Sequence, residues 1–222
     1  MSNNKEKPVT SISFADVVNQ TITFSRAISA EKLVLDLIDT RWFQRMRGIA
    51  QTGNTNLVYM FSEHSRFGHS VGVAHLACQL VERLSRQNPE RVEQYRSAVC
   101  AAALLHDIGH IAPGSHAAYK TWFPSAPDVH EDLSVKLIKS DSQLQSVFDA
   151  NAPSSAELVC KILIESEDLP AWTWQIISGG GWNVDRGNWC IVDSVMAGVN
   201  YGRYNIPALV ESIVITDSGQ LA

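Results

Sequence analysis

The segment RSAVCAAALLHDIGH, residues 96–110, is a largely apolar run that ends in two histidines and an aspartate. The run belongs in a hydrophobic core, so His106, Asp107 and His110 are predicted to lie against that core. Placing titratable groups there costs several kcal/mol unless something pairs with them. A metal ion satisfies imidazole nitrogens and a carboxylate together. The sequence therefore predicts a metal site at the end of this run.

Two further residues can complete such a site. His106 and Asp107 are neighbours at a helix end, about 100° apart around the helix axis, so both can reach one ion. His69 lies on the apolar face of the preceding helix, and a short connection at Pro89 allows the two helices to pack antiparallel. Asp185 follows a glycine turn and opens a later helix. In the alternative interpretation, His106 only packs or caps its helix and Asp107 caps the next turn.

The ligand set His69, His106, Asp107 and Asp185 is a mixed nitrogen and oxygen shell. Such a shell suits one divalent ion: Mn, Fe, Ni, Co, Zn or Mg. The chain has four cysteines, widely spaced and in apolar segments, and no C-x-x-C motif. A zinc-finger site is therefore not expected, and the cysteines are predicted to be free, buried thiols in a reducing compartment.

Composition excludes several classes of protein. A net charge of -5 argues against broad nucleic-acid binding, which needs a basic face, but it leaves room for a small anionic substrate in a locally positive pocket. The polar start MSNNKEKPVTS is not a signal peptide, and no apolar run is long enough to span a membrane. The expected location is the cytoplasm.

Periodicity predicts an all-α protein with a minor β-hairpin or edge strands. Residues 1–10 are predicted to be a disordered tail and residues 11–222 a single domain. TITF, residues 21–24, is a candidate edge strand, and residues 111–129 are a candidate loop rich in proline and glycine. If residues 213–216 form a strand, either the chain ends inside a hairpin of a longer protein or that edge is paired in another way. Helices are expected from residue 31 onward and over 68–87, 90–106, 130–140, 142–150, 154–166, 170–178, 186–199 and the start of 206–215.

The ordered motifs resemble those of HD-domain metal-dependent phosphohydrolases, in particular the deoxynucleoside triphosphate triphosphohydrolase branch. The resemblance covers most of residues 31–216. It rests on DTRWFQRMRGIAQTGNTNLVYMFSEHSRFGHSVGVAHLA, HDIGH, SH at 115–116, HE at 130–131, NVDR and YGRYNIPALVESIVI. The chain departs from that branch at Thr52, where leucine is usual, and at Val192, where arginine is usual.

The resemblance implies a role for each matching residue. The metal ligands would be His69, His106, Asp107 and Asp185. Catalytic or phosphate-contacting histidines would be His110, His116 and His130. Substrate contacts would come from Arg66 to phosphate, Gln51 to the nucleoside and Asp193 to the sugar 3′-hydroxyl.

These residue types suit phosphate hydrolysis. A divalent ion lowers the pKa of its water and screens charge on phosphoryl oxygens. Arg66 can bind two oxygens at once, and Arg186 is a second candidate for the same role, although Arg66 can instead pair with Glu63. A histidine can protonate the leaving oxygen near neutral pH. Trp189, close to Asp185 and Asp193 in sequence, is a candidate pocket wall.

The sequence thus predicts an enzyme that hydrolyses deoxynucleoside triphosphates to nucleoside and triphosphate with a metal-activated water. A nucleotide phosphomonoesterase, a phosphodiesterase on a small metabolite and a non-catalytic nucleotide sensor are the alternatives. A nuclease is disfavoured because the chain is acidic and lacks a basic and aromatic stripe. The expected partners are a nucleotide or another small phosphorylated molecule and further copies of the chain.

Overall fold

The computed structural model describes residues 10–125 and 130–222, without the side chains of residues 116–118. The predicted tail therefore lies outside the described residues, apart from Thr10. Helices dominate the fold, which confirms the all-α prediction. The α-helices are α1 (Ser29–Ile38), α2 (Arg41–Gln44), α3 (Arg66–Gln87), α4 (Pro89–Val92), α5 (Arg96–Leu105), α6 (His116–Trp122), α7 (His130–Ser140), α8 (Ser142–Asn151), α9 (Ser155–Leu163), α10 (Trp172–Ser178), α11 (Val184–Met196) and α12 (Ile206–Ser212).

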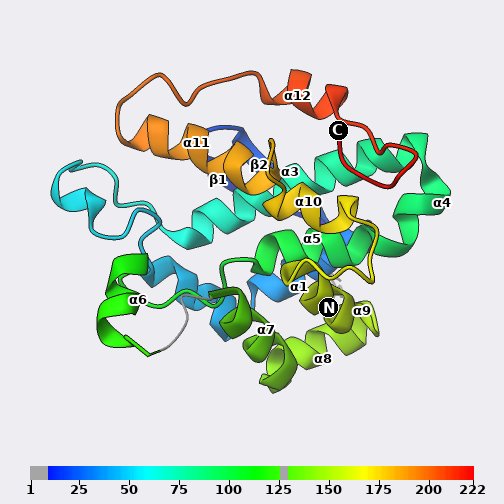
Figure 1. Cartoon of the computed structure of the whole chain (residues 1–222), viewed down its shortest axis with the longest axis horizontal. Helices are drawn as coiled ribbons and strands as arrows, with labels where there is room; N and C mark the ends of the chain where they lie inside the picture. The colour runs from blue at the N-terminus through cyan, green and yellow to red at the C-terminus, as the bar shows by residue number, and fades with distance from the viewer. Residues whose placement is uncertain (1–9, 126–129) are drawn as a thin grey trace, which may run out of the picture.

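Helix α5 lies at the centre of the molecule (Figure 1). Every side chain from Ala98 to Leu105 is buried, as expected for a helix that is apolar on all sides. It packs against α3, α1 and α9, and its run of small alanines lets these neighbours approach closely. The buried cluster around α5 includes residues from Ile22 to Ile215, and a single domain over residues 11–222 stays a prediction.

Helix α3 connects α5 to the C-terminal half of the chain. It contacts α5 along one side and α11 and α12 along another (Figure 1). The helical hydrogen bonds of α3 end at Asn88, and Pro89 then begins α4. The first turn of a helix tolerates proline, because an N–H there has no partner within the helix. The antiparallel arrangement expected across this proline is observed, and it brings the start of α3 to the end of α5.

The small sheet is an N-terminal hairpin. Strand β1 (Ser11–Asp16) pairs antiparallel with β2 (Gln20–Ser25), with Phe14 opposite Ile22. The candidate strand at 21–24 is confirmed, whereas its partner β1 was not anticipated. The hairpin places Ile22 and Phe24 in the core, while β1 alternates between exposed and half-buried positions.

Several predicted boundaries differ from the structure. The single helix expected over 90–106 is three pieces, because α4 is followed by the 3-10 turn η3 (Glu93–Tyr95) before α5 begins. The segment 111–129, expected to be a loop, contains α6. Two more 3-10 turns, η1 (Arg45–Gly48) and η2 (Thr55–Leu57), follow α2. Sequence periodicity misses such short elements because they carry fewer than two helical turns.

The C-terminal segment turns back on itself. Ile215 pairs with Leu221, and Val214 exchanges two backbone hydrogen bonds with Ala222, of 2.8 and 3.0 Å. Gly219, with a φ of 78°, allows the tight turn between them. The strand edge expected at 213–216 is therefore paired within the chain.

Two other expectations concern thiols and membranes. Cys78, Cys100 and Cys160 are free and buried, as predicted, and Cys190 is free and half-buried. Among the described residues, none of the helices combines the length and the apolar character that crossing a bilayer requires.

Candidate metal centre

The His-Asp pair lies where α5 ends. His106 is the C-cap of α5, and the chain then turns so that His110 N–H donates to the Asp107 carbonyl at 3.0 Å. This His-Asp turn, residues 106–110, packs closely against α7. A Cβ on Gly109 would lie only 2.1 Å from the His130 carbonyl oxygen. Ser134 secures this contact, as its hydroxyl accepts from the Gly109 N–H at 2.9 Å. Glycine is required here because α7 leaves no room for a side chain.

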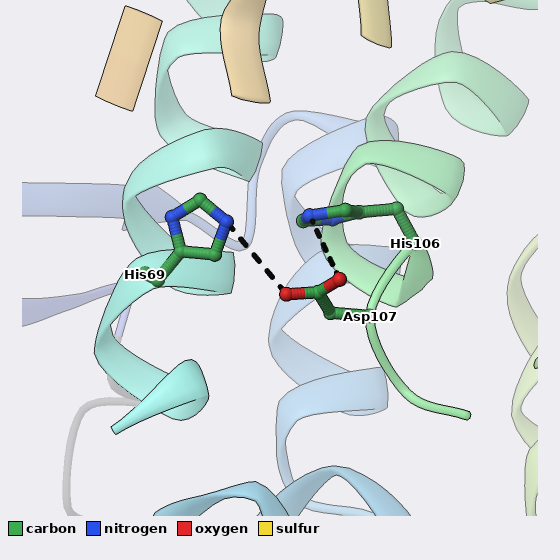
Figure 2. Close-up of side chains that lie close together, drawn as sticks. All are labelled: His69, His106 and Asp107. Atoms are coloured by element: carbon green, nitrogen blue, oxygen red, sulfur yellow. Dashed lines mark ion pairs between the residues drawn. The ribbon is translucent and has the colours of Figure 1, made fainter. Parts of the chain in front are cut away.

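His69, His106 and Asp107 converge on one point from two helices (Figure 2). The Asp107 carboxylate lies 3.8 Å from His69 Nε2 and 3.5 Å from His106 Nε2. The two imidazole rings are 5.3 Å apart and nearly perpendicular. All three side chains are buried, and their ligand atoms lie close enough together to hold one metal ion.

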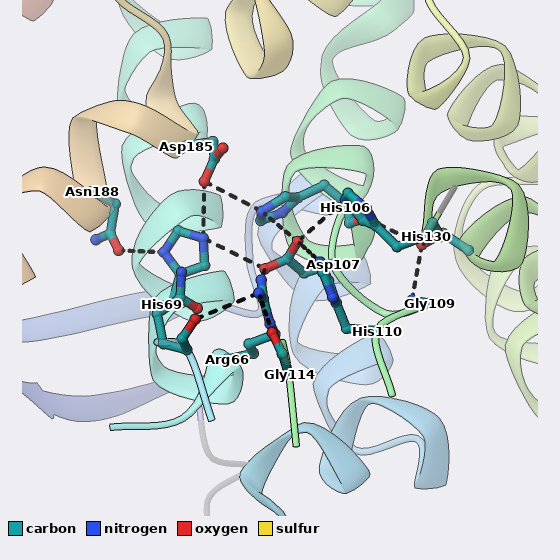
Figure 3. Close-up of polar contacts among 12 residues, drawn as sticks. Arg66, His69, His106, Asp107, Gly109, His110, Gly114, His130, Asp185 and Asn188 are labelled. Atoms are coloured by element: carbon teal, nitrogen blue, oxygen red, sulfur yellow. Dashed lines mark hydrogen bonds and ion pairs between the residues drawn. The ribbon is translucent and has the colours of Figure 1, made fainter. Parts of the chain in front are cut away.

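Asp185 reaches the same point from the first turn of α11. Its Oδ1 lies 2.9 Å from His69 Nε2 and 3.5 Å from His106 Nε2 (Figure 3). Asn183 caps this helix by accepting from the Arg186 N–H, and the glycine turn that precedes Asn183 delivers Asp185 inward. The four residues predicted as ligands are thus brought together from α3, the end of α5 and α11. These four residues, His69, His106, Asp107 and Asp185, form the metal cluster.

The hydrogen bonds made by the Nδ1 atoms of His69 and His106 set which nitrogen of each ring faces the two carboxylates. His106 Nδ1 donates to the Ala103 carbonyl and His69 Nδ1 to the Asn188 side-chain oxygen, each at 2.9 Å. Both acceptors can only accept, so each neutral ring turns an unprotonated Nε2 forward. In the described part of the chain neither Nε2 has a hydrogen-bond partner, although both are buried. Two such lone pairs beside two carboxylates fit a divalent cation.

The charges support the same conclusion. Burial by itself raises the pKa of Asp107 and of Asp185, but the neighbouring histidines outweigh it, and Arg66 adds to the effect at Asp107, so both carboxyls have lowered pKa values and stay ionised. Burial lowers the pKa of His106, yet the two carboxylates raise it to about 9. In the metal-free chain a proton on His106 balances the carboxylates. A metal ion would replace that proton, since a ligand imidazole must be neutral.

Arg66 begins α3 and turns toward Asp107. Its guanidinium forms a buried ion pair with the Asp107 Oδ2 and donates to the Gly114 carbonyl at 3.2 Å. The contacts of Arg66 are thus with the aspartate of the cluster and not with Glu63, the alternative partner suggested by the sequence. The guanidinium neutralises part of the carboxylate charge at the edge of the site.

His110 and His130 lie on the side of Asp107 away from His69 (Figure 3). Their rings stack at 4.0 Å, and their Nε2 atoms are 3.3 and 3.8 Å from the Asp107 Oδ1. Burial lowers the pKa of His110 to about 4 despite the opposing effect of Asp107. His130 also pairs with Glu131 at 3.2 Å. The third predicted histidine, His116, begins α6, and its side chain lies outside the described residues.

One cavity is lined by residues of the cluster, and a second cavity lies farther along α11. One, of about 380 Å³, is lined by His106, Asp107, Asp185 and His130 together with residues 162–165, 177 and 178. The other, of about 550 Å³, lies farther along α11 and is lined by Trp189, Asp193, Thr52 and Tyr59 among others. The Asp193 carboxylate accepts from or pairs with His64 Nε2 at 2.7 Å. Asp185 of the metal cluster and Asp193, predicted to contact the nucleoside sugar, therefore lie along the same helix.

The remaining predicted contacts differ in their surroundings. Gln51 precedes Thr52, which lines this second cavity. The buried side-chain oxygen of Gln51 has no hydrogen-bond partner among the described residues. Arg186 donates to the carbonyls of Gly180 and Gly181, so its guanidinium holds the glycine turn. The role of Arg186 as a phosphate clamp stays a prediction.

Reasoning from sequence alone misses three residues that build the site. Asn188 orients His69, Ser134 joins α7 to the His-Asp turn, and Arg45 donates to the carbonyls of Ile108 and His110 at 2.8 and 2.7 Å. Asn188 could have been found, because it follows Asp185 by three positions and so shares its helix face. The other two depend on long-range packing and carry no sequence signal.

Comparison with known proteins places these residues in context. A family model described as HD domain matches residues 66–177. The uncharacterized protein YwfO of Bacillus subtilis is 33% identical over 86% of this chain and 44% of its own length. A Dictyostelium discoideum protein named deoxynucleoside triphosphate triphosphohydrolase SAMHD1 homolog is 40% identical over 47% of this chain and 21% of its own length. The chain spans less than half the length of these relatives.

Two solved structures share the fold. A hypothetical protein from Aquifex aeolicus has a TM-score of 0.78 and 26% identity, over 96% of this chain and 53% of that one. A phosphohydrolase from Bacteroides thetaiotaomicron also has a TM-score of 0.78, with 25% identity over 96% of this chain and 48% of its own.

Proposed function

The chain belongs to the HD-domain family, and on this premise we propose that it is a metal-dependent phosphohydrolase that acts on nucleotides. The convergence of His69, His106, Asp107 and Asp185, with the Nε2 atoms of both histidines facing two ionised carboxylates, carries the proposal. These four side chains would hold one divalent ion: Mn, Fe, Ni, Co, Zn or Mg. When bound, such an ion lowers the pKa of a coordinated water and neutralises charge on phosphoryl oxygens.

The finer proposal is hydrolysis of deoxynucleoside triphosphates to nucleoside and triphosphate. The Dictyostelium discoideum relative that bears a triphosphohydrolase name supports it, together with the arrangement along α11. Asp185 lines the cavity at the metal cluster and Asp193 lines the second cavity, eight residues or about 12 Å further along the helix. Phosphates would lie at the first cavity and the nucleoside at the second, beside Trp189 and Gln51.

The protein's own groups would supply binding and proton transfer. Water attacks phosphorus, the bond from phosphorus to the nucleoside 5′-oxygen breaks, and that oxygen takes up a proton. His130 suits the role of donor better than His110, because His130 lines the cavity whereas His110 is almost fully buried and its pKa is lowered to about 4. His116 at the start of α6 is a further candidate donor. Arg66 would reach phosphate by leaving part of its pairing with Asp107.

A nucleotide panel tests the proposal. Purified protein is first analysed for bound metal and then incubated with deoxynucleoside mono-, di- and triphosphates. Nucleoside together with tripolyphosphate, detected by chromatography and by phosphate release that requires added pyrophosphatase, supports the finer proposal. Orthophosphate from monophosphates would instead identify a phosphomonoesterase. Thermal stabilisation by nucleotides without turnover, unchanged in Asp107→Ala, would point to a sensor.

A further inference from the structure

Behind the metal cluster, α11 contacts α3 through a buried polar pair. His69 Nδ1 lies 2.9 Å from Asn188 Oδ1, and each residue is only 2% exposed (Figure 3). Asn188 follows Asp185 by three positions, so one face of α11 carries both a candidate ligand and the side chain that orients another ligand. A buried imidazole that loses such a partner has little water with which to replace it.

The hydrogen bond decides which nitrogen of His69 carries the proton. The Asn188 oxygen can only accept, so Nδ1 must donate, and Nε2, which faces Asp107 and Asp185, is left as the nitrogen that a cation would bind. The opposite tautomer would place a proton on Nε2, where a cation must bind. Partners at the rear nitrogen of a ligand histidine commonly change metal affinity by about 10- to 100-fold.

The Asn188 side chain packs against a glycine on α3. A Cβ on Gly72, one turn beyond His69, would lie 2.3 Å from Asn188 Nδ2 and 3.0 Å from Asn188 Cγ. Glycine inside a helix costs about 1 kcal/mol relative to alanine, so its presence here calls for a packing reason. By contrast, a Cβ on Gly68 of the same helix would have nothing within 4 Å.

We propose that Asn188, seated against Gly72, is a positioning residue that holds His69 in the Nδ1-protonated tautomer and so sets the metal affinity of the cluster. The inference rests on the metal site of the proposed function. An amide does this without adding a third negative charge beside Asp107 and Asp185. The pair Asn188 and Gly72 acts as one unit, since a side chain at position 72 would displace the amide from the imidazole.

The test uses two readouts on the full chain. The first is the ¹⁵N NMR spectrum of the His69 imidazole in the metal-free protein, which shows whether Nδ1 carries a proton. The second is the affinity for Mn²⁺, measured by competition with a chelator. The variants are Asn188→Ala, Asn188→Asp and Gly72→Ala, with Gly68→Ala as the matched control.

In the wild type and in Gly68→Ala we expect Nδ1 protonation and equal Mn²⁺ affinity. In Asn188→Ala and Gly72→Ala we expect mixed tautomers and an affinity about 10- to 100-fold weaker. Asn188→Asp keeps the acceptor and should preserve protonation at Nδ1. In the double variant Gly72→Ala/Asn188→Ala the steric conflict is gone, so its thermal stability should equal or exceed that of Asn188→Ala while its Mn²⁺ affinity stays low.

A wild-type tautomer and wild-type Mn²⁺ affinity in Asn188→Ala would overturn the inference. If Gly72→Ala does not fold, the double variant decides the same question. If the wild type binds no divalent metal, the proposed function fails, whereas the NMR readout still decides whether Asn188 sets the tautomer.

Discussion

The Asp107 carboxylate lies among four imidazoles and one guanidinium. Its oxygens are 3.3 to 3.8 Å from the Nε2 atoms of His69, His106, His110 and His130, and it pairs directly with Arg66. A buried carboxylate survives ionised only with such partners, and these partners are the reason that its pKa is lowered. One residue therefore links the metal cluster to the pair of stacked histidines.

Asp107→Asn is expected to abolish metal binding and turnover. The amide keeps the shape of the side chain but leaves the buried Arg66 guanidinium without its counter-ion, and breaking a buried ion pair of this kind costs about 3–5 kcal/mol. Elemental analysis and urea unfolding measure the two effects. A variant that retains the metal content of the wild type would contradict the assigned ligand set.

Arg45→Gln is expected to lower kcat without removing the metal. The Arg45 guanidinium donates to the carbonyls of Ile108 and His110 and so holds the turn that carries His110. A displacement of about 1 Å in such a turn can cost up to about 100-fold in rate. Arg86→Gln, which alters an exposed arginine on α3, is the control. An unchanged kcat in Arg45→Gln would show that the turn is held without Arg45.

At the scale of secondary-structure elements, the site depends on how α7 and α8 are attached to the central helices. Helix α7 approaches the His-Asp turn so closely that only glycine fits at position 109, and Ser134 bonds to that turn. Helix α8 begins at Asp141, whose carboxylate accepts from Leu144 N–H at 3.0 Å and from Trp42 Nε1 at 2.9 Å.

Gly109→Ala is expected to destabilise the fold by about 1–3 kcal/mol, the usual range for overpacking. The new methyl would lie 2.1 Å from the His130 carbonyl and 2.6 Å from the Ser134 nitrogen, so α7 must shift and carry His130 with it. Thermal unfolding gives the stability, and turnover should fall as well. Gly68→Ala serves as the control, and equal stabilities for the two variants would refute the packing argument.

Asp141→Ala is expected to cost about 1–3 kcal/mol, which combines a lost N-cap with a half-buried indole N–H that loses its acceptor. The cost should depend on pH. Burial alone raises the pKa of Asp141, but Arg41, the Leu144 N–H and Trp42 lower it below its ordinary value. The contribution is therefore present above the unfolded-state pKa of about 4 and is lost as pH falls through the lower folded-state pKa. Urea unfolding at neutral and acidic pH should show the gap between wild type and variant closing in acid.

At the scale of the whole molecule, α3, α5 and α11 bring together residues that are far apart in the chain (Figure 1). A metal ion held between these helices would bind only the folded state. At a free concentration of 100 times Kd it should add about 2.7 kcal/mol of stability, or about 5–10 °C in Tm for a chain of this size. Calorimetry with Mn²⁺ and then with EDTA measures this shift. The same increase in Tm in His106→Ala would place the ion elsewhere.

The sequence by itself determined the helical class, the long helix before Pro89, the hairpin strand at 21–24 and the His-Asp motif at the end of the central helix. Those features are local: apolar spacing, a proline and adjacent residues act within a few turns of chain. It also gave reason to group Asp185 with His69, because the glycine turn and the opening of a helix are local signals too.

Only the tertiary structure decided what surrounds those residues. That Arg66 turns to Asp107, that Arg186 holds the glycine turn and that Asn188 orients His69 all depend on which helices pack together and at which register. The splitting of the helix expected over 90–106 has the same origin, because the chain must bend to place α5 against three neighbours at once. Contacts between distant segments are set by the packing of whole helices, and no single stretch of sequence encodes that packing.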